Sequence, residues 1–432
     1  MSLLQHCSGA CDIKMIQSIF NELVMERNEN GFGYFLLSII LIIACENLYS
    51  QATELAISSN KKVPVVELSG NGYQRGLQHG KALKNEIGEV FKKWKENIQL
   101  STNLNVDSVI SMFYRATNFE PAIKTWTPEL FDELKGISKS TGQSFKDVFC
   151  FQLVDEFWVY LDKLQNPEYH HCSGIGIAAT NSHPAYIAQN MDLENFMNGY
   201  QVLFHISSYN NEPEQYLLSC AGLIALNGIN SNGIGVCVNT LMQLEASSDG
   251  LPVACVIRGI LSKQDGASAL KFLKTIKHAS GQNYIIGIVD SVYDFEASAN
   301  KVVRFLPDAD NPLLVYHTNH PLTNDDIKPW YIESQKKILS GEAKNNNSFI
   351  RFTSLKNRLT LPDSNFSINL IKEILRSKDN QLNPICRVYK NGEAVFTFSS
   401  VILTLGKNPS IQLTRASPDQ SEYVLHSFKN KK

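Results

Sequence analysis

The stretch His170-His-Cys-Ser-Gly-Ile-Gly-Ile177, followed after a polar turn by Ala188-Gln-Asn-Met-Asp192, decides the fold of this chain. Cys172 stands at the head of a run of small and β-branched residues, and a second β-prone run covers residues 185–190. Two such runs around a short polar turn predict a β-hairpin. The sequence therefore places a thiol at the first residue of a hairpin and the carboxylate of Asp192 about one hairpin later.

A catalytic cysteine needs a thiolate and a nearby base. No histidine stands at an obvious partner spacing from Cys172, which makes the cysteine's own α-amine a candidate base. Such an amine has a pKa of about 7.7–8.0 and suits proton transfer near neutral pH. It exists only if the bond His171–Cys172 is cut. The alternative is a buried structural thiol, the commonest state of a lone cysteine.

A Cys-Ser pair at a strand start, with Asn190-Met-Asp192 twenty residues on, resembles the acyl-coenzyme A:6-aminopenicillanic acid (isopenicillin N) acyltransferase-like family. Members of that family are autoproteolytic N-terminal-nucleophile cysteine hydrolases. They usually show Asn-Trp-Asp. Here Met191 replaces the Trp, the residue of the three that is least involved in the chemistry. The resemblance implies that cleavage after His171 frees Cys172 as the nucleophile and that Asp192 holds its new amine.

Short motifs in the family's order extend the resemblance from Gly72 to Ala416. The string Gly72-Tyr-Gln-Arg-Gly-Leu-Gln-His-Gly80 matches the N-terminal signature, although glycines before a helix also permit close backbone packing. We expect His79 in this string to make a structural hydrogen bond.

Two further positions carry functional expectations. Asn239 follows the turn Asn232-Gly233 on a returning strand, and the resemblance makes its amide the donor to the oxyanion. A polar residue at a strand end is the alternative. Ser348-Phe-Ile-Arg351 resembles the family's Ser-x-x-Arg and makes Arg351 the candidate functional arginine.

The resemblance implies an α+β fold, the N-terminal-nucleophile αββα sandwich, with two antiparallel sheets between helical layers; alternating strand pairs and helix pairs allow it. We expect helices over residues 129–142 and 145–160, the second with Asp155 and Glu156 on a solvated face. Residues 162–169 have the composition of an exposed loop, where a backbone can be cut without loss of the fold.

Residues 1–52 have the features of a leader with a signal peptide. The apolar run 35–44 is shorter than the roughly 20 residues of a membrane span and is typical of a signal-peptide core. Cleavage after Ala52 gives a soluble protein, whereas a lipoprotein-like box makes Cys45 a candidate lipid anchor. Met25 is an alternative start. We expect export to the periplasm or the extracellular space.

After the leader, we expect a helical N-terminal chain over residues 53–171 and a second chain over residues 172–432 that begins with the nucleophile. Composition gives no electrostatic case for nucleic acid or an anionic membrane, because 40 basic residues balance 42 acidic ones. No motif calls for a cofactor. His317 and His320 have the spacing of a ligand pair but lack a third ligand, so no metal is expected.

The sequence thus predicts an autoproteolytic acyltransferase or amidohydrolase that acts on linear amides or thioesters through an acyl-enzyme on Cys172. Its partners would be a small acyl donor and an amine or water acceptor, and its two chains would form one heterodimer. An exported, uncleaved binding or structural protein is one alternative, because a small residue is expected where His171 stands. A cysteine protease with His317 or His320 as base is the other.

Overall fold

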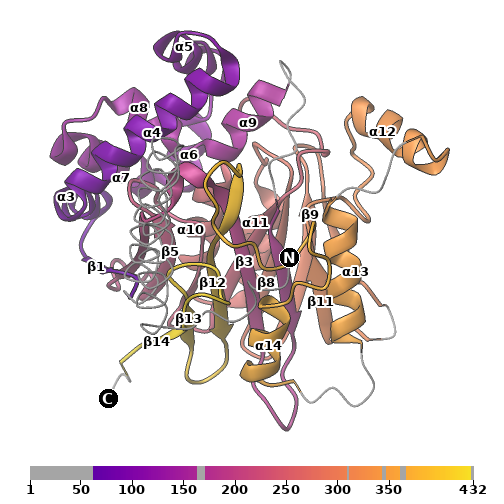
Figure 1. Ribbon diagram of the computed structural model, residues 1–432. Helices are drawn as coiled ribbons and strands as arrows, with labels where there is room; N and C mark the ends of the chain where they lie inside the picture. Colours follow the sequence, from indigo (N-terminus) through magenta and orange to yellow (C-terminus); the bar gives the residue numbers. More distant parts are fainter. Residues whose placement is uncertain (1–61, 163–170, 309–310, 343–346, 361–365, 430–432) are drawn as a thin grey trace, which may run out of the picture. The chain divides into compact units, whose positions relative to one another are not determined.

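The computed structural model describes residues 62–162, 171–308, 311–342, 347–360 and 366–429 (Figure 1). The chain divides into two units, Met1–Ser58 and Ser59–Lys432, and every described residue belongs to the second. The expected leader and the lipid-anchor candidate Cys45 therefore lie outside the described residues. Nearly all of the expected loop over residues 162–169 lies outside them as well.

Two sheets form the centre of the second unit (Figure 1). In order across the larger sheet, its strands are β1 (Val65–Leu68), β4 (Gln201–Ile206), β5 (Gln215–Cys220), β6 (Asn227–Asn230), β7 (Ile234–Thr240), β8 (Gln282–Ile288), β9 (Ser291–Ala297) and β10 (Val302–Phe305). In order across the smaller sheet, they are β11 (Leu314–His317), β2 (Ser173–Ile177), β3 (Tyr186–Glu194), β12 (Val395–Thr404), β13 (Ser410–Leu413) and β14 (Val424–Ser427).

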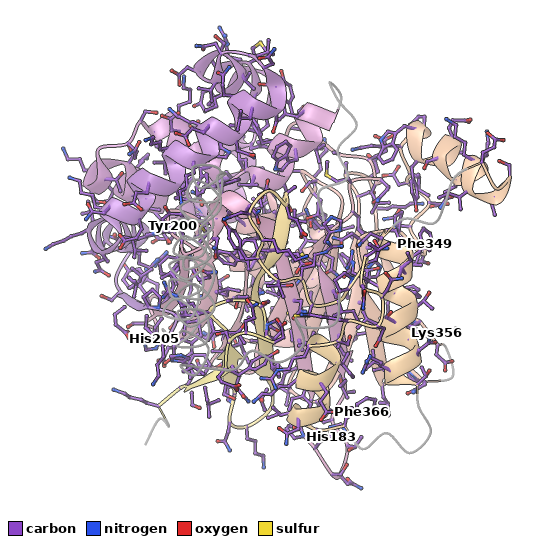
Figure 2. All side chains as sticks on the ribbon, viewed as in Figure 1. His183, Tyr200, His205, Phe349, Lys356 and Phe366 are labelled. Atoms are coloured by element: carbon purple, nitrogen blue, oxygen red, sulfur yellow. The ribbon has the colours of Figure 1, made fainter. Side chains whose placement is uncertain are left out.

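The predicted hairpin is the antiparallel pair β2–β3, with Ser173 opposite Asn190. Its turn carries His183, whose ring lies 6.2 Å from the ring of Phe366 (Figure 2). All pairings are antiparallel except that of β1, which runs parallel to β4. The two expected sheets are found, and the one parallel pairing lies at an edge, where the strand comes from the segment before the nucleophile.

Strand β2 of the smaller sheet has the larger sheet on one face and a helix on the other, and its residues alternate in size accordingly. A Cβ atom on Gly174 would lie 2.7 Å from Ile285 Cδ1, so the facing sheet approaches this strand closely. Ile175 points the other way and belongs to an apolar cluster with Leu355 of α13 (Asn347–Leu359). The alternation of glycine and isoleucine thus gives one face to the sheet interface and the other to a helix.

Helices cover the outer faces of both sheets. Helix α10 (Val253–Leu261) packs on β6 and β7, and α11 (Gly266–Thr275) packs on α10. Helix α13 packs on β11, and α14 (Ile368–Leu375) packs on β3 and β12, while α12 is Pro329–Leu339. The predicted αββα sandwich is confirmed.

The segment before the nucleophile is helical: α3 (Gly72–Ala82), α4 (Lys84–Thr102), α5 (Val106–Ala116), α6 (Glu120–Trp126), α7 (Pro128–Thr141), α8 (Phe145–Phe151) and α9 (Val154–Asp162). The single helix expected over residues 145–160 is two helices, because the chain turns at Gln152 and Leu153. Gly142 ends α7 with φ 81°, as the sequence predicts.

The glycine signature lies within helix α3 itself rather than before a helix. A Cβ atom on Gly76 would lie 1.9 Å from the carbonyl oxygen of Glu133 on α7, which shows that the two backbones touch. The Glu133 carboxylate then binds Arg75 of α3 and Arg258 of α10 in the buried interior. The signature therefore connects α3 with α7 and, through Glu133, with α10. His79 accepts a hydrogen bond from Gly222 N, as expected.

We expect Gly76→Ala to lower the free energy of unfolding by about 1–3 kcal/mol, because the added methyl group must separate α3 from α7. Gly88→Ala in α4 is the matched control, since the nearest atom to its added Cβ lies 4.0 Å away. The control should gain about 0.5–1 kcal/mol from its better helix propensity. Urea unfolding measures both, and equal effects would contradict the contact.

Candidate active site

Cys172 precedes β2 and lies in the buried interior. Its Sγ lies 3.6 Å from Met191 Sδ and 3.8 Å from the carbonyl oxygen of Asp192, both on β3. The residue that departs from the family's Asn-Trp-Asp pattern is thus in contact with the thiol. Burial raises the pKa of Cys172 to about 12, and the nearby Asp192 carboxylate adds to this rise. In the uncleaved chain the thiol is therefore protonated and needs a base to react.

Cys172 lines a small cavity of about 50 Å³. Helix α9 contributes Val154 and Asp155, strand β3 contributes Asp192 and Glu194, and β7 and α10 contribute mainly apolar side chains. The sequence-based placement of Asp155 and Glu156 on a solvated face is wrong. Glu156 is 3% exposed and accepts hydrogen bonds from Val253 N, at the start of α10, and from Ser280 Oγ.

The Asp192 carboxylate is fully buried. Its Oδ1 accepts a hydrogen bond of 2.7 Å from Thr397 Oγ1 on β12. Its Oδ2 has no hydrogen-bond partner among the described residues and lies 3.8 Å from Arg387 Nε. Burial raises the pKa of Asp192 to about 7, against the opposing effect of the two nearby arginines. Asp192 Oδ2 can therefore accept a hydrogen bond from a group near Cys172.

We expect the pH dependence of stability to report this carboxylate. Because its folded pKa is raised above the ordinary value near 3.9, stability falls as pH rises from about 4 to about 7 and is then constant. Asp192→Asn removes this component. In a Cys172→Ala chain, which cannot react, the added Asp192→Asn should reduce the loss of stability across that range. An identical pH profile for the single and double variants would contradict the buried ionisation.

Arg351 fixes the backbone around the thiol from the first turn of α13. Its Nη1 donates to the carbonyl oxygen of Cys172 and, at 2.9 Å, to Ser173 Oγ. Its Nη2 donates at 3.0 Å to Asn319 Oδ1. Burial lowers the pKa of Arg351 to about 10, so the guanidinium remains charged at neutral pH. The structure thus brings Cys172, Asp192 and Arg351 together.

The residue before the predicted scissile bond is also held by α13. His171 Nδ1 lies 3.0 Å from Asn347 Oδ1, and the same oxygen accepts from Arg351 Nε at 2.6 Å. Both sides of the His171–Cys172 bond are therefore anchored to one helix end. His171, at the position where a small residue is expected, is thus held by Asn347.

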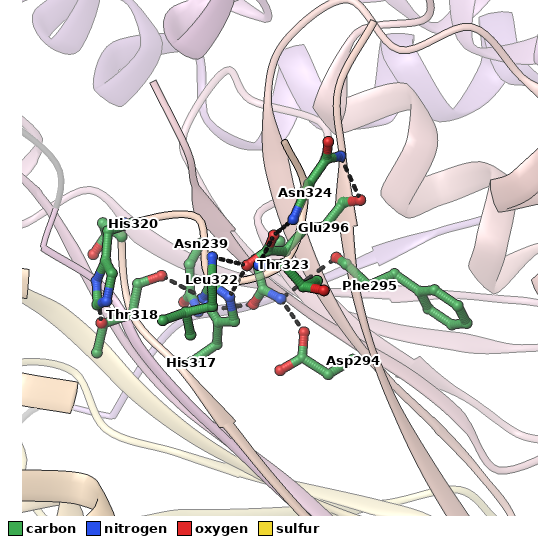
Figure 3. A network of polar contacts seen from close by, with 12 residues as sticks. Asn239, Asp294, Phe295, Glu296, His317, Thr318, His320, Leu322, Thr323 and Asn324 are labelled. Carbon is green, nitrogen blue, oxygen red and sulfur yellow. Dashed lines mark hydrogen bonds and ion pairs between the residues drawn. The ribbon is translucent and has the colours of Figure 1, made fainter. Parts of the chain in front are cut away.

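Asn239 lies at the interface of the sheets rather than on the cavity wall, which its neighbours Val238 and Thr240 line. Its amide nitrogen would lie 3.3 Å from a Cβ atom on Gly174, two residues along the chain from the thiol. Its Nδ2 donates to Asn283 Oδ1 at 3.0 Å, and Asn283 Nδ2 donates to Asp294 (Figure 3).

The hydrogen bonds from Asn239 to Asn283 and on to Asp294 run in one direction, which the last residue of the series determines. The Asp294 carboxylate accepts a hydrogen bond, so the amide atom of Asn283 that faces it is the nitrogen. The oxygen of Asn283 then faces Asn239, which must present its own nitrogen. Asn239 Oδ1 accepts at 3.0 Å from Gln189 Nε2. One N–H of Asn239 therefore remains for another acceptor on the side of β2.

Asn319 is a site residue to which the sequence reasoning gave no role. Its Oδ1 accepts from Arg351, and its Nδ2 donates at 3.1 Å to the carbonyl oxygen of Thr240, a residue of the cavity wall. The only signal in the sequence is its position between His317 and His320.

Neither of those histidines is recorded in contact with Cys172 among the described residues. His317 Nδ1 lies 2.7 Å from the Thr318 carbonyl oxygen and its Nε2 lies 2.9 Å from Glu296 Oε1 (Figure 3). Because both partners accept, both ring nitrogens donate and the ring is charged. Burial would lower the pKa of His317, but the nearby carboxylates of Asp294 and Glu296 outweigh burial and raise it.

His320 is neutral, since burial lowers its pKa to about 3, and its Nδ1 lies 2.7 Å from Ser348 Oγ. These positions do not support the histidine-base alternative. In the described part of the chain, no group of three His, Cys, Asp or Glu side chains is placed to hold a metal ion. No helix there has the length and apolar character to cross a membrane.

Several solved structures resemble this one at low identity. An N-acylethanolamine-hydrolyzing acid amidase orthologue from Caenorhabditis elegans is 15% identical, with 54% of this chain and 92% of that chain covered and a TM-score of 0.37. A penicillin V acylase from Agrobacterium tumefaciens is 14% identical, with coverages of 56% and 82% and a TM-score of 0.36. A variant of conjugated bile acid hydrolase from Clostridium perfringens is 11% identical, with coverages of 60% and 97% and a TM-score of 0.34.

A curated relative covers more of the chain. The acyl-coenzyme A:6-aminopenicillanic-acid-acyltransferase 40 kDa form of Emericella nidulans is 21% identical over 369 residues, which are 84% of this chain and 96% of the relative. The sequence pattern of the family itself matches residues 179–405. Asp192, Asn239 and Arg351 fall within these residues, and Cys172 precedes them. The match spans more than half of the chain, which therefore belongs to the acyl-coenzyme A:6-aminopenicillanic acid acyl-transferase family.

Proposed function

We propose that this protein is an N-terminal-nucleophile cysteine amidohydrolase or acyltransferase that cuts its own His171–Cys172 bond and then acts on small linear amides or thioesters. The observation that carries this proposal is the position of Cys172. Its thiol lines a cavity beside Asp192, and the peptide bond that precedes it is anchored on both sides by α13.

In the self-cleavage step, Cys172 Sγ attacks the carbonyl carbon of His171. The thiol proton passes to the leaving nitrogen, the C–N bond breaks, a thioester forms on Cys172 Sγ, and the nitrogen becomes the α-amine. Water then hydrolyses the thioester, which leaves a carboxylate on His171 and a free thiol on Cys172. Arg351 supports this step because it holds the Cys172 carbonyl oxygen still while the bond on its other side breaks.

In turnover, the new α-amine takes the thiol proton and Sγ attacks the substrate carbonyl carbon. Asp192 Oδ2, which lacks a hydrogen-bond partner among the described residues, is the group that holds the amine. The free N–H of Asn239 donates to the oxyanion. The leaving amine carries the proton away, and the acyl group passes from sulfur to water or to an acceptor amine. The uncleaved chain, in which the thiol pKa is raised to about 12, lacks this amine, so the base becomes available only after self-cleavage.

The two products of self-cleavage would remain one heterodimer. Glu133 of α7 binds Arg258 of α10 through two hydrogen bonds, of 2.9 and 3.0 Å, in the buried interior. Strand β1 also pairs with β4 across the cut. Both contacts join the segments on either side of the cut, so they favour a complex of the two chains.

We also propose that the protein is exported, which rests on the sequence of residues 1–52 alone. Cell fractionation of the native precursor tests this, and recovery from the cytosol alone would contradict it. Fatty-acid labelling with and without Cys45→Ala distinguishes a lipid anchor from a soluble form.

Trapping of the acyl-enzyme tests the proposed chemistry. The purified protein is incubated with simple N-acyl amides, and intact-mass spectrometry follows the larger fragment, with hydroxylamine added to release the acyl group as a hydroxamate. We expect a single acyl adduct on Cys172. Release of free amine with no adduct on Cys172, or with the adduct on another residue such as Ser348, would contradict the proposal.

A further inference from the structure

Strand β9 carries a buried carboxylate, Glu296, that binds a loop distant from it in sequence. The loop is residues 318–321, which follow the end of β11 and lead to residues 322–324. Glu296 is fully buried, and its two carboxylate oxygens accept hydrogen bonds from the residues on either side of this loop (Figure 3).

The hydrogen bonds reach both ends of the loop. Before it, His317 Nε2 donates to Glu296 Oε1 at 2.9 Å. After it, Leu322 N donates to the same oxygen at 2.6 Å, and the backbone N–H groups of Thr323 and Asn324 donate to Oε2 at 3.0 and 2.6 Å. One carboxylate therefore closes the loop at its base.

This arrangement requires an ionised carboxylate. Every partner of the Glu296 side chain is a donor, and only a carboxylate can accept on both of its oxygens without a donor of its own. Burial would raise the pKa of Glu296, but the hydrogen bond and charge of His317 and the backbone N–H groups of Asn324 and Leu322 outweigh burial and lower it. Glu296 is therefore charged at neutral pH.

The loop carries Asn319, whose side chain reaches the active site. Asn319 Oδ1 accepts at 3.0 Å from Arg351, the residue that holds the carbonyl oxygen of Cys172. Asn319 Nδ2 donates at 3.1 Å to the carbonyl oxygen of Thr240 on the cavity wall. Both distances are near the limit of about 3.2 Å for such bonds, so a shift of the loop would break them.

We propose that Glu296 is a positioning residue of the active site: it closes the loop of residues 318–321 so that Asn319 holds Arg351 against Cys172. This inference rests on the proposed function, because it concerns the same site. Glu296 is not among the residues that line the cavity, so its effect reaches the thiol through the loop.

Glu296→Gln tests the proposal. The side chain keeps its size, but its amide nitrogen is a donor and must face N–H groups of the loop. For the mature protein we expect kcat for amine release from a simple N-acyl amide to fall about 10-fold, within the 10²-fold that a 1 Å misplacement can cost. KM should stay nearly unchanged, because Glu296 does not line the cavity.

Glu214→Gln is the matched control. Glu214 also accepts a hydrogen bond from a histidine, His205 of β4, near the opposite edge of the larger sheet (Figure 2). The substitution removes the same group from a similar pair that has no contact with the loop. We expect kcat and KM of this variant to equal those of the unmodified protein.

A double-mutant cycle identifies the route of the effect. If Glu296 acts through Asn319, Glu296→Gln should lower kcat no further in an Asn319→Ala protein. In an Asn239→Ala protein the same substitution should still lower kcat about 10-fold, because Asn239 does not belong to the loop. A purely structural role of Glu296 would give the same loss in both backgrounds.

Glu296→Asp is the second variant, for use if the glutamine variant does not fold. It keeps the charge beside His317 but is one methylene shorter, so it cannot reach both ends of the loop. We expect a loss of kcat here too, again absent in the Asn319→Ala background.

The outcomes separate this inference from the function on which it rests. A normal kcat in the Glu296 variants, or an undiminished further loss in the Asn319→Ala background, would overturn the inference and leave the proposed function intact. If the unmodified mature protein releases no amine from N-acyl amides, both the inference and the proposed function fail.

Discussion

Cys172→Ala should leave the protein as one uncleaved chain without amide hydrolysis. The substitution removes the thiol that attacks the His171 carbonyl carbon, and the same thiol is the nucleophile of turnover. We therefore expect both activities to be lost together and completely, as judged by a denaturing gel and by release of free amine.

Cys237→Ala is the matched control. Cys237 is also buried and lies on β7, but it does not line the cavity. We expect this variant to be cleaved and active. Cleavage or amide turnover that persists in the Cys172→Ala protein would contradict the assignment of the nucleophile.

Asn239→Ala should give a cleaved protein that turns substrate over about 10²–10³ times more slowly, with little change in KM. This is the usual cost of one lost oxyanion donor, because the charge that it stabilises exists only in the transition state. The measurement is the steady-state rate of amine release by the mature variant. Normal cleavage shows that the fold around Cys172 is retained.

Asn319→Ala provides the comparison, because Asn319 also lies close to the thiol through Arg351 and Thr240. We expect its effect on kcat to be smaller, because Asn319 meets the site through Arg351 and Thr240, whereas Asn239 lies beside Gly174 on the strand that follows the thiol. If Asn319→Ala reduces kcat by the larger factor while Asn239→Ala does not, the oxyanion donor is Asn319. Loss of turnover in fully cleaved His317→Ala and His320→Ala proteins would instead support a histidine base.

Sequence patterns predicted the elements that depend on residues close together in the chain, such as turns and helix ends. The hairpin from Cys172 to Asp192 follows from two β-prone runs around a polar turn, and the end of α7 follows from Gly142. The order of short motifs predicted the family and the αββα fold that the resemblance implies, and the family is confirmed over residues 179–405.

Features that depend on distant partners could not be predicted in the same way. The glycine at position 76 is explained by α7, more than fifty residues away in sequence, which fills the space that a side chain would occupy. Asp155 and Glu156 have the composition of a solvated face, yet Asp155 binds the ends of β7 and β8 and Glu156 binds the start of α10. The importance of Asn319 likewise depends on Arg351, which reaches it from another helix.

N-terminal sequencing of the larger fragment tests the central claim most directly. The account predicts two chains, with the larger one beginning Cys-Ser-Gly-Ile-Gly and the smaller one ending at His171. A larger fragment that begins at any other residue, or a fully active protein that remains a single chain, would contradict an N-terminal nucleophile at Cys172.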